Sequence, residues 1–320
     1  MAPLTFGIEL ECHIATLAYG EGDPDPQNPR LVYLQPQSLS TPRKELDYVK
    51  SQVATKLQAE AGLAVRNSTD PLFGPVIWSV AEDFTLKTAS GPLVKYTSYP
   101  LEIISPPLTY QQSSLDEVRK MCNIISNTFR MDCNETTGFH VHVGNGMNAD
   151  ERPFSFETSR KLLAIIWTYE HQIESLHPEH RRNSRYCKGM HTESAIYRNT
   201  TRQGLEKILA SPDLDNLRWM TLTSGKQSAY NLMRVNWVFA GKTVEFRQHE
   251  GTLHGEAVVN WIIFVVKLME TATSLEENEL VKKLWEVVEL EEKGQKVSVF
   301  HLMRTLLNCP EVADYYEIRG

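Results

Sequence analysis

The sequence predicts one α+β domain, in which an antiparallel or mixed sheet packs helices on one face and carries polar groups on the other. Several short segments alternate strictly between apolar and polar residues, as half-buried strands do. Several longer segments repeat apolar residues at helical spacing. Neither an internal repeat nor a low-complexity block interrupts the 320 residues. We therefore expect a single domain over residues 1–320.

The first elements come directly from these patterns. In LTFGIELECHI the apolar residues alternate with a second face that carries Glu9, Glu11 and His13, which predicts a half-buried strand. Residues 18–40 are rich in Gly, Pro, Asp and Gln and predict a surface loop. A helix is expected to begin at Thr41 and Pro42 and to end near Gly62.

The middle of the chain is also predicted to contain both strands and helices. Strands are expected over 76–86 and 99–104, and Ser114 with Glu117 predicts a capping box at the start of the next helix. That helix has apolar residues on one side, namely Val118, Met121, Ile125 and Phe129. A third alternating strand over 138–143 and a long helix over 154–176 follow.

The rest of the chain is polar at first and helical at its end. Residues 177–200 are rich in Arg and His and are the expected place of a lid or substrate loop. A strand pair over 229–239 and 243–249 is separated by the three residues of a short hairpin loop. Helices are expected over 256–273, 281–290 and 298–307, so that residues 274–320 form a C-terminal helical extension.

Composition excludes several classes of protein. The net charge is −7 and no long run of Lys or Arg occurs, which argues against nucleic-acid binding. The five scattered cysteines include no CxxC pair, which predicts reduced thiols and a cytoplasmic protein. No secretion signal is apparent, and the most apolar stretch, residues 258–266, is too short to span a bilayer, so no membrane partner is expected.

Three strands carry candidate functional residues on their polar faces. Glu9 and Glu11 stand at i and i+2, so their carboxylates project to one side about 6–7 Å apart, a spacing that suits two hard cations. In GFHVHVG, His140 and His142 share one face. Each motif also has an ordinary structural explanation, the solvated face of an exposed strand for the glutamates and hydrogen-bonded packing for the imidazoles.

The third strand, TVEFRQHEGT, places Glu245 and Arg247 on its polar face, where alone they would be an ordinary cross-strand charge pair. Solvated strand faces normally also carry Lys, Thr, Ser and Gln, so three faces of Glu, His and Arg favour one lined cleft. Such a cleft would repel itself without cations, which indicates divalent metals and an anionic ligand for the arginine. ATP with Mg²⁺ or Mn²⁺ meets both requirements.

The motifs GIELE, LEIISPPL, GFHVHVG, RRNSRYC and VEFRQHEGTL occur in this order between about residues 4 and 270. In this arrangement the chain resembles the amidoligase family, whose sheet is similar to that of glutamine synthetase and glutamate–cysteine ligase. The resemblance implies a metal-lined funnel on the sheet and an ATP-dependent ligase that joins a carboxylate to an amine.

The resemblance also implies roles for particular residues. Glu9 and Glu11 would each supply a ligand to one of two metal ions. Glu102 would join Glu11 at the metal nearer the substrates, and His140 and Glu245 would join Glu9 at the metal that holds the terminal phosphates. His142 would contact phosphate, and Arg247 would face the transferring phosphoryl group.

The sequence departs from the better-known ligases in several places. No segment matches the small N-terminal domain or the ammonium-site loop of glutamine synthetase, and only Glu102 stands where that enzyme supplies two further glutamates. Asp83 is a candidate for the unfilled position.

The Arg-rich segment offers Arg181, Arg182 and Arg185 as possible clamps for phosphates or a carboxylate. Asn231 and Asn236 receive no role. A thiol nucleophile at Cys187 beside His180 is disfavoured, because a lone loop cysteine is usually inert.

The expected reaction is phosphoryl transfer from ATP to a small-molecule or peptide carboxylate, followed by attack of an amine on the acyl phosphate and release of ADP and phosphate. Two alternatives stay open. One is a guanidino-kinase-like phosphotransferase, and the other is a non-catalytic protein that binds metal or nucleotide. The sequence identifies neither substrate and does not define the oligomeric state.

Overall fold

The computed structural model describes residues 3–30, 33–34, 41–66, 77–87, 91–147, 151–221, 227–235 and 242–319. Their contacts group the chain into two compact units. Unit 2 contains Gly7–His140 and Glu250–Val259, and unit 1 contains Met1–Phe6, Val141–His249 and Asn260–Gly320. Strands β1 (Leu4–Leu17) and β8 (Gly138–Asn145) and helix α8 (Gly255–Ser274) contribute residues to both units. This grouping therefore does not test the single domain expected from the sequence, which stays a prediction.

Unit 2 is built on β1 (Leu4–Leu17), which pairs antiparallel with β5 (Thr97–Ile104). On the far side of β5 come β4 (Trp78–Glu82), which is antiparallel to β5, and then β3 (Val65–Arg66). Short strands β2 (Tyr33–Leu34) and β7 (Met131–Asp132) also pair with β1, and β6 (Leu108–Thr109) follows β5. The predicted strands 99–104 and 76–86 are thus present, with the second of them shorter than expected.

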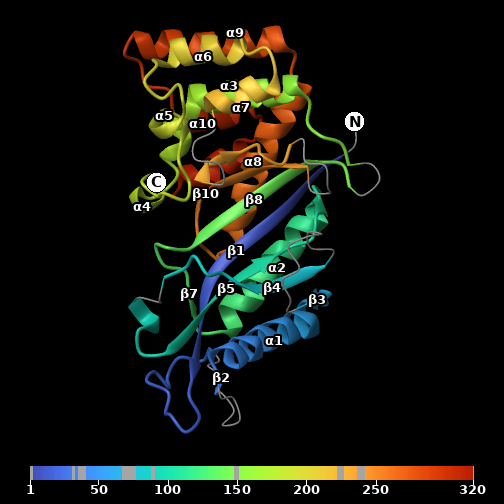
Figure 1. Cartoon of the computed structure of the whole chain (residues 1–320), viewed down its shortest axis with the longest axis vertical. Helices are drawn as coiled ribbons and strands as arrows, with labels where there is room; N and C mark the ends of the chain where they lie inside the picture. Colours follow the sequence, from blue (N-terminus) through green and yellow to red (C-terminus); the bar gives the residue numbers. More distant parts are fainter. Residues whose placement is uncertain are drawn as a thin grey trace. The chain divides into compact units, whose positions relative to one another are not determined.

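One face of this sheet packs against α1 (Pro42–Ala61) and α2 (Gln112–Thr128), with α1 in contact with β3, β4, β5 and α2 (Figure 1). The Thr41 hydroxyl caps α1 by accepting the Lys44 N–H, and Gly62 ends the helix in the left-handed conformation at φ 72°. The helical face predicted for α1 is buried, through Leu46, Val49, Val53 and Leu57. The face predicted for α2 is also buried, through Val118, Met121 and Ile125.

The predicted capping box at the start of α2 is wrong. The helix begins three residues earlier than expected, with Gln111 as its N-cap, so Ser114 lies inside its first turn, and no side chain caps it. The Glu117 carboxylate instead accepts a 2.8 Å hydrogen bond from the Trp78 indole N–H and ties α2 to β4. A tertiary partner has replaced the local one.

Unit 1 contains most of β8 (Gly138–Asn145), followed in sheet order by β10 (Thr243–Glu250) and β9 (Tyr230–Asn231). Strand β9 is antiparallel to β10, with Asn231 opposite Glu245. The expected strand 229–239 is therefore only two residues long within the described part of the chain. Asn236 and most of the predicted hairpin loop lie outside the described residues.

The helices of unit 1 gather around α3 (Phe156–Glu174), which contacts α6 (Thr201–Leu209), α7 (Leu214–Thr221) and α9 (Glu277–Glu292). Figure 1 shows α6 and α9 together above α3, and both helices contact α3. The sequence did not predict α6, α7 or the last helix, α11 (Pro310–Glu317). The predicted helix 298–307 is a short turn, α10 (Val299–His301), that continues into the wider turn η4 (Leu302–Leu306).

The polar segment 177–200 is not the open loop that its composition predicts. It contains the short helices α4 (Glu179–Arg182) and α5 (Met190–Glu193), and several of its side chains are buried. The cause is hydrogen bonding to strand β10 and helix α3, described below.

Helix α8 (Gly255–Ser274) is longer than the apolar stretch seen in the sequence. By length and composition it is long and apolar enough to cross a membrane, so the expectation that the apolar segment here is too short to span a bilayer is wrong. However, 67% of its apolar window is buried inside the protein, which is the environment of a core helix.

Candidate active site

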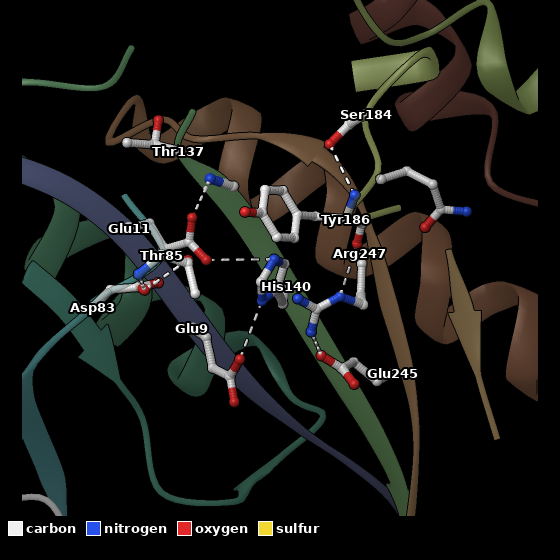
Figure 2. A network of polar contacts seen from close by, with 12 residues as sticks. Glu9, Glu11, Asp83, Thr85, Thr137, His140, Ser184, Tyr186, Glu245 and Arg247 are labelled. Carbon is white, nitrogen blue, oxygen red and sulfur yellow. Dashed lines mark hydrogen bonds and ion pairs between the residues drawn. The ribbon is translucent and has the colours of Figure 1, made fainter. Parts of the chain in front are cut away.

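Unit 2 brings together a cluster of acidic side chains and one imidazole, Glu9, Glu11, Asp83, Glu102 and His140, here called the carboxylate cluster. Figure 2 shows the two β1 glutamates reaching the same imidazole. His140 Nδ1 lies 3.1 Å from Glu9 Oε2, and His140 Nε2 lies 3.6 Å from Glu11 Oε1. The other oxygen of Glu11 accepts the Gly138 backbone N–H at 2.6 Å. The alternation predicted for β1 and β8 therefore places all three side chains on one face.

Sheet register adds Glu102 to the carboxylate cluster. Glu102 lies directly opposite Glu11 in the pairing of β1 with β5, and its other neighbour in the sheet is Ala81 of β4. Asp83 follows β4 in a turn, where its Oδ1 accepts the Thr85 N–H and hydroxyl, both at 2.7 Å. The sequence left Asp83 only as a candidate for the unfilled ligand position. The structure brings it to the cluster.

Two groups of three donors in this cluster have the spacing of metal ligands. Glu9, Glu102 and His140 can place their ligand atoms within 4.8 Å of one another, and so can Glu11, Asp83 and Glu102. Carboxylate oxygens suit Mg²⁺, and a site that also includes an imidazole suits Mn²⁺ as well. The donor set thus fits the divalent metals expected from the sequence, with Glu102 available to both groups.

Unit 1 holds a second constellation, Glu245, Arg247 and His142, here called the arginine cluster. Arg247 forms an ion pair with Glu245, and its Nε donates to the Tyr186 carbonyl at 3.2 Å (Figure 2). The Glu245 carboxylate also accepts a 2.9 Å hydrogen bond from the Asn231 side-chain amide, and His142 Nε2 lies 3.8 Å from the other Glu245 oxygen. The Tyr186 and Asn231 contacts fix the guanidinium and the carboxylate in place. The structure therefore assigns Asn231, which had no role from sequence, to holding Glu245.

The three arginines of segment 177–200 separate into two kinds. Arg181 is buried and donates to the backbone carbonyls of Arg247 at 2.7 Å and Gln248 at 3.3 Å. It anchors the segment to β10 through these two carbonyls, and a role as a ligand clamp stays a prediction. Arg182 and Arg185 are exposed, and Arg185 lies over the Tyr186 ring at 4.8 Å. These two remain candidates for phosphate binding.

Cys187 has the surroundings of an inert thiol. It is buried, and its Sγ lies 3.0 Å from the Arg181 carbonyl. Burial raises the pKa of the Cys187 thiol above its ordinary value, which lowers the thiolate population needed for nucleophilic attack. The unfavoured thiol-nucleophile hypothesis therefore gains no support.

Sequence reasoning missed a buried carboxylate, Glu170 of α3. Its oxygens accept the Met190 N–H at 2.7 Å and the His191 N–H at 2.5 Å. Gly189 packs so closely that an added Cβ would lie 3.0 Å from a Glu170 oxygen and 2.9 Å from a Glu174 oxygen. Glu170 therefore holds the chain just beyond Tyr186, the residue whose carbonyl positions Arg247. No periodicity could reveal this, because a glutamate on a helix usually faces solvent.

Burial raises the pKa of Glu170 to about 7, because desolvation outweighs the two backbone hydrogen bonds. A raised folded pKa means that the stability contribution of this group is complete below about pH 4.5 and is lost as pH rises through about 7. We expect Glu170→Gln to abolish this loss, which is on the order of 3 kcal/mol. Urea unfolding of both proteins at pH 5 and pH 8 measures the change.

The test depends on how the difference in unfolding free energy between parent and variant changes with pH, so a constant cost of the amide cancels. A difference that stays the same at both pH values would contradict the assignment. Glu279→Gln, on an exposed part of α9, is the control and should leave the pH dependence unchanged. Other charged or titratable groups surround Glu170, namely His171, Glu174, His177, Arg181, Arg182, Cys187, His191 and Tyr230.

Comparison with known proteins identifies the family. A family model described as "Putative amidoligase enzyme" matches residues 2–269. The chain belongs to this amidoligase family. The match spans both clusters, from Glu9 on β1 to Arg247 on β10, and confirms the resemblance inferred from the motifs.

Other comparisons are weaker. Plasmodium falciparum glutamine synthetase, known from an electron cryomicroscopy structure, is similar with a TM-score of 0.44 and 8% sequence identity. The alignment covers 84% of this chain and 52% of that protein, so the amidoligase chain spans about half the length of the synthetase. A sequence comparison with curated proteins gives no match. The mixed α+β architecture with mostly antiparallel strands, predicted from sequence, is confirmed by the structure itself.

Proposed function

We propose that this amidoligase joins a carboxylate to an amine at the expense of ATP, through an acyl phosphate, with release of ADP and phosphate. The observation that carries the proposal is the carboxylate cluster, in which two groups of three donors share Glu102. A family of carboxylate–amine ligases and a donor set for divalent metals together favour phosphoryl chemistry over other uses of a sheet face.

The residues that would hold Mg²⁺ or Mn²⁺ are those of the two donor groups. Bound there, the metal would neutralise phosphate charge and orient the reacting oxygens. Glu245 is a further proposed metal ligand by family resemblance. Strand β8 contributes His140 to the carboxylate cluster and His142 to the arginine cluster.

The proposed work of the arginine cluster is electrostatic. Arg247 would stabilise negative charge on the phosphoryl group during its transfer. The Tyr186 carbonyl and Glu245 hold the Arg247 guanidinium in one orientation. His142, Arg182 and Arg185 would contact the nucleotide phosphates. A preorganised donor costs no reorganisation at the moment of transfer, which is why fixed contacts to Arg247 favour a role in the transition state.

The carboxylate substrate is proposed to be a small molecule or a peptide terminus, and the protein is proposed to act in the cytoplasm. The five cysteines are all free thiols, as expected of a reducing compartment. That the protein binds neither nucleic acid nor membrane stays a prediction.

Trapping with hydroxylamine tests the function directly. The protein is incubated with ATP, Mg²⁺, hydroxylamine and pools of amino acids and short peptides as carboxylate donors. The proposal predicts a hydroxamate that depends on both ATP and the metal, because hydroxylamine attacks an activated carboxyl group. Transfer of phosphate to a guanidino compound without any hydroxamate would instead show a phosphotransferase. Absence of product with every pool, both with and without Mg²⁺, would show a protein that only binds metal or nucleotide.

A further inference from the structure

The polar face of β1 continues beyond Glu9 and Glu11 to His13, which the reaction above does not use. The His13 side chain is 1% exposed, and both of its ring nitrogens are buried without a hydrogen-bond partner among the described residues. Buried polar atoms are normally paired, so these nitrogens have hydrogen-bonding capacity that none of the described residues uses. Sheet register shows what surrounds them. Asp132 of β7 lies directly opposite His13, and Pro100 of β5 lies on its other side.

Carboxylates dominate the charge on this face. Among the described residues, the charged side chains of β1, β4, β5 and β7 that share it are all carboxylates, and so is that of Asp83 after β4; the set is Glu9, Glu11, Asp83, Glu102 and Asp132. The guanidinium of Arg130, which precedes β7 and lies opposite Ala15, is paired with Asp23. Two divalent metals at the two donor groups would compensate about four of these five negative charges. Asp132 belongs to neither donor group. A cation beside Asp132 would complete the charge balance.

We infer that the acceptor substrate is a short aliphatic diamine whose distal ammonium group binds between Asp132 and the free ring nitrogen of His13. The inference rests on the proposed function and names its amine. Residues at i and i+2 on a strand project about 6–7 Å apart, so His13 lies that far along the face from Glu11. A four-carbon diamine spans this distance, which places its second nitrogen at the metal group of Glu11, Asp83 and Glu102.

The chemistry at the second nitrogen is ordinary acyl transfer. The neutral amine forms the C–N bond, the bond from the acyl carbon to the phosphate oxygen breaks, and phosphate leaves with the bonding electron pair. The proton lost by nitrogen passes to phosphate or solvent. An amino acid is a poor occupant of the same place, because its carboxylate would face Asp132, and the neighbouring guanidinium of Arg130 is already paired with Asp23.

Calorimetric titration of the full chain with three matched probes tests the inference. With Mg²⁺ and a non-hydrolysable ATP analogue present, 1,4-diaminobutane should bind at least about tenfold more tightly than either 1-aminobutane or 4-aminobutyrate, the scale of one charged hydrogen bond. Asp132→Asn should abolish this preference, and His13→Phe should reduce it several-fold while keeping the position filled. Glu135→Gln, exposed in the connection from β7 to β8, should leave it unchanged.

The discrimination among probes by the unaltered protein decides the matter even if a variant fails to fold. Equal binding of 4-aminobutyrate and 1,4-diaminobutane, or an unchanged preference in folded Asp132→Asn, overturns the inference. Hydroxamate formation by the parent separates this failure from failure of the function. A protein that makes hydroxamate but does not prefer the diamine is a ligase with another acceptor, whereas a protein that makes none contradicts the ligase proposal itself.

Discussion

Glu9→Gln is expected to lower ATP-dependent turnover by about 10²- to 10³-fold or more while the protein stays folded. Glu9 is a donor in one of the two metal groups and contacts His140 at 3.1 Å, so the amide weakens metal binding without changing side-chain volume. Removing one of several neighbouring negative charges also relieves repulsion in the metal-free protein. Thermal melts should therefore show the variant at least as stable as the parent without metal, but with a smaller gain in stability on adding Mg²⁺.

The same measurements of turnover and thermal stability apply to Glu11→Gln and Glu245→Gln, and glutamine is a better test substitution than alanine at both positions. Glu11 accepts a backbone N–H from Gly138, and Glu245 is paired with Arg247 and Asn231, so truncation would leave buried partners unsatisfied. Glu135→Gln is the matched control at an exposed site. If Glu9→Gln loses stability but keeps both turnover and the Mg²⁺-dependent gain, Glu9 is structural and the metal assignment fails.

Arg247→Ala is expected to lower the maximal rate by about 10²-fold and to raise the half-saturating ATP concentration much less. The reason is that a guanidinium fixed by the Tyr186 carbonyl is placed to stabilise charge that develops only during transfer. Steady-state kinetics at saturating Mg²⁺ separates the two parameters. Arg247→Lys should recover little, because an ammonium group lacks the planar fork.

Arg198→Ala is the control, since Arg198 is exposed in the same segment and pairs with Tyr197. It should leave both parameters unchanged. A large rise in the half-saturating ATP concentration with an unaltered maximal rate for Arg247→Ala would show that this arginine only binds ground-state nucleotide.

Much of the carboxylate cluster was predictable because β-strand geometry is local. Side chains alternate across a pleated strand, so the sequence alone placed Glu9 with Glu11 and His140 with His142 on shared faces. Register between strands is not local, and the opposition of Glu11 and Glu102 was expected only through family resemblance. Asp83 comes from a turn, where no periodicity applies, and its contribution to the cluster needed the structure.

The errors have a common physical cause. Three charged residues are in sequence contexts that suggest solvent exposure or a local helix cap, namely Arg181, Glu170 and Glu117. Each instead forms hydrogen bonds with an element that is distant in the sequence. Burying a charged side chain costs little free energy only when backbone or side-chain groups form hydrogen bonds or ion pairs with it, and tertiary structure determines which groups these are. The polar segment 177–200 looked like an open loop because its anchors on α3 and β10 lie far away in the sequence.

Analysis of the nucleotide product by ³¹P NMR tests the central claim most directly. The parent protein is supplied with ATP, Mg²⁺ and a carboxylate and amine pair that supports turnover. Transfer of the γ-phosphoryl group to the carboxylate predicts ADP and phosphate in a one-to-one ratio with amide. Stoichiometric AMP and pyrophosphate would show attack at the α-phosphate instead, and would contradict both the acyl-phosphate mechanism and the role proposed for Arg247.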